Sequence, residues 1–212
     1  ISKSAGTTFS STVNAATITI SDSKASTDVT FSGNVTATTG LTVTGTANAY
    51  NVVFNGSSNT IASTTTFSNT GTVTLGDASG DSITFTGGVT ATAPSQVNIG
   101  GTINSSNATI SIGDSNTPIS LTANSTISGN TSGNITLGGT INGAYTLDVN
   151  TTGTTTFSGI IGGSTALTSL TTNTGGTVAI NTTAISTTGA QTFNENATLG
   201  SDLTLTSNSS GN

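Results

Sequence analysis

The stretch Ile83-Thr-Phe-Thr-Gly-Gly-Val-Thr-Ala91 contains the pattern that decides the fold of this chain. Apolar residues alternate with Thr, which places the apolar side chains on one side of an extended strand and the hydroxyls on the other. The pattern also stands 54 residues earlier, at Val29-Thr-Phe-Ser-Gly-Asn-Val-Thr-Ala37, where the glycine after the first triplet recurs. Repetition of short strands at a fixed spacing is typical of solenoid proteins.

An 18-residue step, one third of this spacing, aligns the aromatic residues along the chain. Five of the seven Phe residues fall in one column of this step, together with Leu121; they are Phe31, Phe67, Phe85, Phe157 and Phe193. The preceding column contains Thr30, Thr66, Thr84 and Thr156. We therefore expect the Phe column to point into a core and the Thr column to face water.

These patterns predict an all-β fold, a single-stranded parallel β-helix (β-solenoid) with about 18 residues per turn and roughly 11–12 turns. Residues 1–212 are expected to form one continuous solenoid. A right-handed winding is predicted, because parallel strand connections are overwhelmingly right-handed. A left-handed β-helix stays open as an alternative, since an apolar residue at every sixth position, as at Ala37, Val73 and Ala91, is typical of that fold.

The composition argues against several classes of function. Lys3 and Lys24 are the only cationic side chains, and the formal net charge is −6, which disfavours binding to nucleic acid or to anionic lipid. No apolar run is long enough to span a membrane as a helix. The first residues, Ile1 to Gly6, do not resemble a signal peptide, so we expect a mature form or a segment of a longer protein.

The side chains needed for common catalytic sites are also missing. The chain has no Cys or His, which excludes the nucleophilic triads built on these residues. Its acidic residues are Asp22, Asp28, Asp77, Asp81, Asp114, Asp148, Glu195 and Asp202. Glycosidase and lyase sites need clustered carboxylates with a base or metal beside them. The sequence therefore predicts that the protein is not an enzyme and has no catalytic, cofactor-binding or metal-binding residue.

One acidic turn invites comparison with calcium sites. Gly76-Asp-Ala-Ser-Gly-Asp81 is rich in oxygen donors, which suit Ca²⁺. A single Asp114 follows Gly113 without a second carboxylate nearby. The favoured interpretation is that these Asp residues cap turns through local backbone hydrogen bonds. We therefore expect no metal requirement.

The C-terminal third resembles the tandem β-strand repeats of very large bacterial surface proteins, the filamentous-haemagglutinin-like and autotransporter-like adhesins. The resemblance rests on Thr154–Gly163, Ala166–Thr172, Gly175–Ile180, Thr187–Phe193 and Ala197–Leu205, and it covers about residues 135–207. It implies export to the cell surface, a right-handed β-helix and a role in attachment, biofilm or surface-layer assembly. Such repeats define an architecture rather than a ligand, so no binding residue is carried over.

The predicted function is a structural rod of a secreted bacterial surface adhesin or extracellular filament. The alternative is an ice-binding solenoid, because Thr84-Phe-Thr86, Thr30-Phe-Ser32, Thr66-Phe-Ser68, Ser120-Leu-Thr122 and Thr156-Phe-Ser158 each place two hydroxyls outward. Neither Ile1–Phe9 nor Leu203–Leu205 contains a capping pattern. The expected partners are therefore other copies or flanking repeats, head to tail along the axis, with an unknown surface receptor or glycan in addition.

Overall fold

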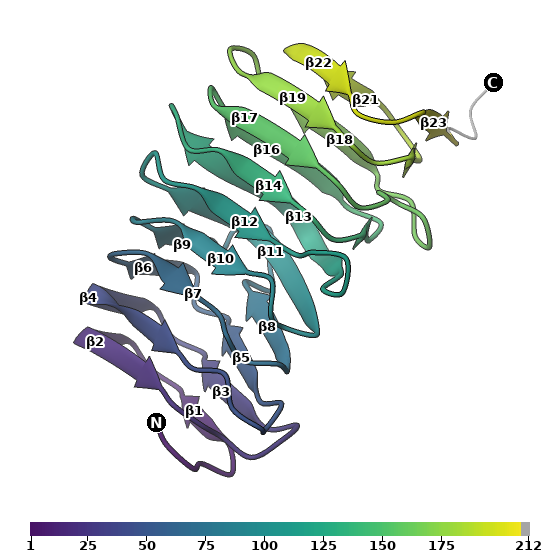
Figure 1. The fold of residues 1–212 in the computed structure, drawn as a ribbon. Helices are drawn as coiled ribbons and strands as arrows, with labels where there is room; N and C mark the ends of the chain where they lie inside the picture. Colours follow the sequence, from purple (N-terminus) through teal and green to yellow (C-terminus); the bar gives the residue numbers. More distant parts are fainter. Residues whose placement is uncertain (209–212) are drawn as a thin grey trace.

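The structure, a computed structural model, describes residues 1–208, which form strands and no helix. The strands pair in parallel at an interval of about 22 residues, and they stack as about nine turns of a β-solenoid. Figure 1 shows these turns stacked in chain order from the N-terminal to the C-terminal end. The predicted all-β solenoid is therefore confirmed.

Each turn has three faces, which we call A, B and C in chain order. Face A consists of β1 (Thr7–Phe9), β3 (Asp28–Phe31), β5 (Asn51–Phe54), β8 (Thr72–Leu75), the first halves of β11 (Gln96–Ser105) and β13 (Ile119–Asn130), β15 (Ile141–Asn142), β20 (Ala184–Thr187) and β23 (Thr204–Ser207). Face B consists of the first halves of β2 (Val13–Ile20) and β4 (Val35–Val43), β6 (Ser58–Ile61), β9 (Ser82–Phe85), the second halves of β11 and β13, β16 (Thr146–Thr151), β18 (Ser169–Thr172) and β21 (Gln191–Phe193). Face C consists of the second halves of β2 and β4, β7 (Thr65–Thr66), β10 (Val89–Ala91), β12 (Ile110–Ile112), β14 (Ile135–Leu137), β17 (Thr154–Phe157), β19 (Thr177–Ile180) and β22 (Asn196–Leu199).

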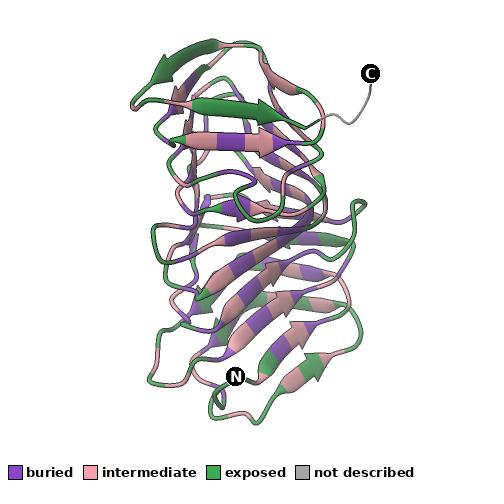
Figure 2. Ribbon diagram, turned by 90° about the vertical axis from the view of Figure 1, so that its right-hand side faces the viewer, coloured by how far each residue is buried: buried purple, intermediate pink, exposed green. Residues whose placement is uncertain are grey.

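Inward side chains of each face stack directly on one another. On face A one column of paired residues runs from the first turn to the last: Thr7, Val29, Val52, Val73, Val97, Ile119, Ile141, Ile161, Ile185 and Leu205. All of its members from Val29 to Ile185 are buried. Figure 2 shows the resulting alternation of buried and more exposed residues along the strands. One turn could not cover this surface alone, so the core exists only through stacking.

The predicted turn length of 18 residues and the predicted 11–12 turns are wrong. The described chain makes about nine turns of about 22 residues. The physical reason lies in the corners. Val29, Val35 and Leu41 lie six residues apart on faces A, B and C, but the next residue of the face A column is Val52, eleven residues after Leu41. A spacing of six residues thus separates equivalent core positions on faces A, B and C, whereas the corner from face C back to face A is longer.

The predicted single column of Phe side chains is also wrong, although the direction of its members is largely confirmed. Phe31 and Leu121 lie on face A, Phe85 and Phe193 on face B, and Phe67 and Phe157 on face C; all are buried except Phe193, which is half-buried. The residues Thr30, Thr66, Thr84 and Thr156 are not buried, as predicted. The sequence therefore predicts the alternation within each strand correctly, but not the alignment of one turn with the next.

Asparagine side chains at the corners tie successive turns together. The Oδ1 atom of Asn34 accepts a hydrogen bond from the Ser58 N–H at 3.0 Å, in the next turn. Asn107 accepts in the same way from the Thr131 N–H, and Asn134 from the Thr154 N–H, each at 2.9 Å. Ser58 and Thr154 are the first residues of β6 and β17, and backbone N–H groups at such strand starts need partners. The high asparagine content thus has a structural explanation.

A few hydroxyls point into the core. Thr155 of β17 is fully buried between Ile135 and Val178 of the neighbouring turns, and its Oγ1 has no hydrogen-bond partner among the described residues. An unsatisfied buried hydroxyl costs free energy. We expect Thr155→Val to raise the free energy of unfolding by about 1 kcal/mol in urea titration. The matched control is Thr156→Val, which alters an outward position; an equal gain there would contradict the explanation.

Candidate functional site

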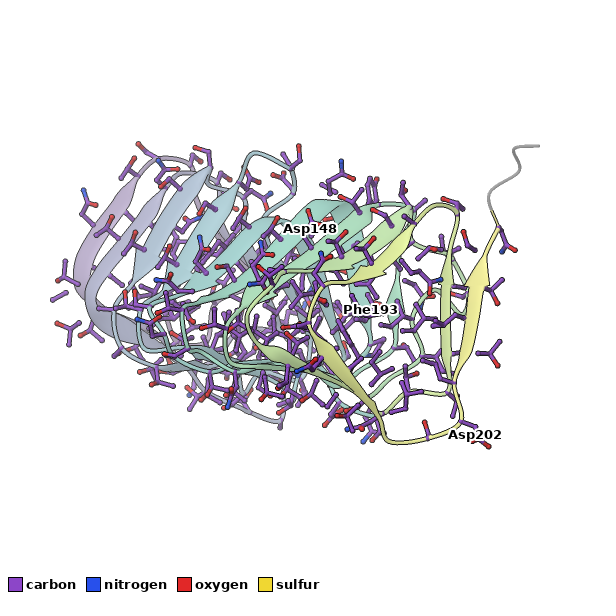
Figure 3. All side chains as sticks on the ribbon, turned by 90° about the horizontal axis from the view of Figure 1, so that it is seen from above. Asp148, Phe193 and Asp202 are labelled. Carbon is purple, nitrogen blue, oxygen red and sulfur yellow. The ribbon has the colours of Figure 1, made fainter. Side chains whose placement is uncertain are left out.

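The acidic residues are spread along the solenoid rather than gathered at one place. Among residues 1–208, no group of three or more His, Cys, Asp or Glu side chains is close enough to hold a metal ion. Asp148 lies on face B and Asp202 at the corner between β22 and β23 (Figure 3). At the corner after β21, burial raises the pKa of Glu195. The structure does not bring these carboxylates together as a catalytic group.

The carboxylates that do meet are Asp77 and Asp81, within one turn between β8 and β9. Asp81 is buried, and its Oδ2 accepts hydrogen bonds from the backbone N–H groups of Asp77 (2.9 Å) and Ala78 (3.0 Å). Burial is the largest cause that raises the pKa of Asp77, and the neighbouring Asp81 carboxyl raises it further. Asp114 likewise accepts from the N–H groups of Asn116 and Thr117 at 2.8 and 2.9 Å. Both carboxylates cap local backbone, the interpretation that the sequence favoured.

Removing the Asp81 carboxylate tests this capping role against calcium binding. We expect Asp81→Ala to lower the free energy of unfolding by about 1–3 kcal/mol, because the N–H groups of Asp77 and Ala78 lose their carboxylate acceptor. The loss should be the same in excess Ca²⁺ and in chelator, as measured by thermal melting. Asp148→Ala, on the outer surface of face B, is the control and should change little. A melting temperature of the unaltered protein that falls in chelator, with Asp81→Ala insensitive, would show a calcium site instead.

Another carboxylate, Asp22, lies at the corner that follows face C in the N-terminal part of the stack. It accepts hydrogen bonds from Asn48 Nδ2 at 3.1 Å and from Thr46 Oγ1 at 3.0 Å, and these two bonds, that of Asn48 first, lower the pKa of Asp22. Nearby, the hydroxyl of the buried Tyr50 donates to the Thr44 carbonyl at 2.6 Å, and burial raises its pKa to about 12. These hydrogen bonds join consecutive turns, and the side chains of Asp22 and Tyr50 both have partners within the protein.

The outer surface of face C presents a row of hydroxyls that sequence analysis did not find. Eight of its nine central positions are Thr or Ser: Thr19, Thr42, Thr66, Thr90, Ser111, Thr136, Thr156, Ala179 and Thr198, where Ala179 is the exception. The row predicted from the 18-residue step does not exist, because Thr30 and Ser120 lie on face A and Thr84 lies on face B. Only Thr66 and Thr156 belong to the true row.

Two members of this hydroxyl row, Ser111 and Thr136, line a hollow over β12, β14 and the end of β17. The hollow has a volume of about 610 Å³ and is lined by Gly113, Gly138, Ser158, Asp114 and the exposed side chain of Ile160, among others. A Cβ atom on Gly138 would meet the carbonyl oxygen of Gly113 in the turn before. Close approach of the two backbones therefore requires the glycine at this position.

The last described turns leave apolar surface open. Leu199 of β22 is 57% exposed and Leu205 of β23 is 52% exposed, although both continue columns that are buried elsewhere. Figure 2 shows these strands as the most exposed part of the stack. Ile160 and Tyr145 are the other large exposed hydrophobic residues of the described chain, and they lie at corners of inner turns.

Comparison with known protein families, curated proteins and solved structures finds no match. Residues 1–208 contain no helix that could cross a membrane. The argument for function therefore rests on the architecture and the outer faces.

Proposed function

We propose that this protein is a structural rod of a bacterial surface adhesin or extracellular filament. The observation that carries the proposal is the unbroken face A column, which links the first strand to the last through ten stacked residues from Thr7 to Leu205. A stack held by parallel ladders and one continuous core is stiff along its axis, and it gains length by adding turns. Strands about 4.8 Å apart would make this segment a rod somewhat over 40 Å long.

The composition and the outer surface support a rod outside the cell. The chain is 5% charged, and its outward strand positions are mostly Thr, Ser and Asn, which suits a surface that must stay soluble without specific partners. The likeness of residues 135–207 to adhesin repeats points in the same direction. Asp81 and Asp114 cap turns through backbone N–H groups, and the proposed role of the protein is mechanical rather than enzymatic.

Surface labelling of the source cells tests the location and the role together. Antibodies raised against this chain are expected to bind intact cells and to label extended material outside them in electron microscopy. Attachment of the cells to surfaces should survive replacement of outward residues, such as Thr74→Ser and Asn98→Ser. It should be lost when a buried residue that the stacking of turns requires is replaced. Label confined to the interior of the cells would refute the proposal.

A second candidate function, ice binding, is favoured by the hydroxyl row of face C. Its hydroxyls repeat at the spacing of neighbouring strands, about 4.8 Å, and so form a regular array on one face. If this row binds ice, the unaltered protein should slow ice recrystallisation at micromolar concentration, and Thr136→Tyr should abolish the effect while Thr84→Tyr on face B should not. The structural proposal predicts no such activity for any of the three.

A further inference from the structure

The hollow on face C lies where the corners of the solenoid change length. The corner from face C to face A has six residues after β12 (113–118), but only three after β14 (138–140) and three after β17 (158–160). These three strands are stacked in consecutive turns (Figure 1). The longer corner therefore projects beyond the next two, and its residues Asp114 and Ser115 line one side of the hollow.

The projecting corner is held in place by its own hydrogen bonds. The backbones of Asp114 and Thr117 exchange two hydrogen bonds, at 3.3 and 3.2 Å. The Asp114 Oδ1 atom also accepts from the N–H groups of Asn116 and Thr117. The Thr117 hydroxyl donates to the Pro94 carbonyl of the preceding turn at 2.6 Å. A wall that is already ordered does not have to lose conformational entropy when a ligand binds against it.

Polar groups that line the hollow are free to bind a ligand. Within residues 1–208, no side-chain hydrogen bond is made by the hydroxyls of Ser111, Thr136, Thr140 and Ser158. The same holds for Asp114 Oδ2, because the two backbone N–H groups that Asp114 caps are both bound to Oδ1. A hydroxyl can donate one hydrogen bond and accept others, whereas a carboxylate only accepts. The hollow therefore presents donors together with a larger number of acceptors.

Ile160 supplies an apolar surface beside these polar groups. Its side chain is 41% exposed, and it lines the hollow at the end of β17. Ile160 and Thr140 also line a second hollow of about 360 Å³, so the two hollows adjoin at these residues. Small-molecule sites typically combine apolar contact with a few polar groups, in volumes of about 300–1,000 Å³. The pair of hollows thus has room for a ligand of more than one ring.

The charge of the hollow restricts the chemistry of its ligand. Asp114 is the only charged residue that lines it. The cationic side chains of the protein, Lys3 and Lys24, lie in the first turns and do not line the hollow. With this carboxylate and a formal net charge of −6, the protein repels anionic ligands. A neutral ligand rich in hydroxyl groups can satisfy both the donors and the acceptors.

We propose that the hollow over β12, β14 and β17 binds a neutral oligosaccharide. Sugar hydroxyls donate to Asp114 Oδ2 and exchange hydrogen bonds with Ser111, Thr136 and Ser158, while the C–H face of one ring packs on Ile160. The chain of sugar units continues past Ile160 into the adjoining hollow. This site rests on the proposed function, because it gives the rod a ligand on the surface to which it attaches.

Nuclear magnetic resonance titration of the isotope-labelled chain tests the site directly. The probes are neutral tetrasaccharides of glucose, galactose, mannose and N-acetylglucosamine, and a short oligolysine peptide is included for comparison. We expect at least one tetrasaccharide to bind with a dissociation constant of about 1 mM or lower. The amide signals that shift should be those of residues 111–115, 136–140 and 158–160.

Two substitutions remove the proposed contacts without removing the fold. Asp114→Asn keeps an oxygen to cap the corner but replaces Oδ2 with a donor, so the affinity should fall at least about tenfold. Ile160→Ser removes an exposed apolar side chain, and the affinity should fall a few-fold. Tyr145→Ser is the matched control, because Tyr145 is 37% exposed at the corner between β15 and β16 and does not line the hollow. It should bind as tightly as the unaltered chain.

Several results would overturn the proposal. They are no binding of any tetrasaccharide at ten times the expected dissociation constant, shifts that map to face B, and an affinity that both hollow variants retain. Binding of the oligolysine peptide in the hollow without binding of the sugars would overturn it as well, since a cationic ligand would then be the occupant. Surface labelling of the cells without saccharide binding would refute this site alone, whereas saccharide binding with label confined to the cell interior would refute the rod alone.

Discussion

Gly76→Ala is expected to be among the most damaging single substitutions in this protein. Gly76 follows β8 with a φ of 78°, in the left-handed region that L-residues rarely adopt. A Cβ atom there would also overlap the carbonyl oxygen of Gly100 in the next turn. Backbone strain costs about 1–2 kcal/mol and overpacking about 1–3 kcal/mol. The melting temperature should fall by roughly 4–20 °C for a chain of this size.

The control lies four residues further along the same turn. A Cβ atom on Gly80 would have no neighbour within 4 Å, and no positive φ is recorded there. Gly80→Ala should leave the free energy of unfolding unchanged or raise it by about 0.4–1 kcal/mol, because Ala lowers the conformational entropy of the unfolded chain. Similar losses for both variants would mean that the turns are not packed backbone against backbone at Gly76.

The direction of side chains was predictable from the sequence because it depends only on neighbours along one strand. In Val29-Thr-Phe31 and Ile83-Thr-Phe85 the apolar residues are buried and the central Thr is not. This alternation needs no knowledge of which strand lies next to it. The fold class followed from it, since many short strands of this kind bury their apolar side only by stacking.

The alignment of turns was not predictable because all three faces use the same triplet. Val29-Thr-Phe31 lies on face A and Ile83-Thr-Phe85 on face B, so their likeness marks two strands rather than two equivalent turns. Corner lengths also vary: Val73 and Ile83 on successive faces are ten residues apart, whereas Val29 and Val35 are six. A search for one fixed period averages over such corners.

The same difficulty concealed the candidate surfaces. The hydroxyl row of face C becomes visible only once Thr90, Ser111 and Thr136 are known to be neighbours, at intervals of 21 and 25 residues. Spatial neighbours of this kind leave no fixed spacing in the sequence. By contrast, the capping role of Asp81 was predictable, because its partners lie within the same turn.

Phe31→Ala is expected to show how far the turns depend on one another. Phe31 is fully buried between Phe9 and Phe54, with ring centroids 5.1 and 4.9 Å away and nearly parallel planes. Removal of the ring leaves a cavity and ends both aromatic contacts, so the free energy of unfolding should fall by about 3–5 kcal/mol.

Because each turn contacts only its neighbours, the loss from Phe31→Ala should concentrate in the N-terminal turns. Hydrogen exchange should therefore quicken in β1, β3 and β5 before it does in β17 and β19, and thermal melting should gain an early transition. Thr30→Ala, one residue away on the outer surface, is the control and should stay within about 0.5 kcal/mol of the unaltered protein. A uniform rise in hydrogen exchange along the whole stack would instead show that the solenoid unfolds as a single cooperative unit. In that case no turn would unfold locally before the others, and the loss of one core side chain would destabilise the entire rod.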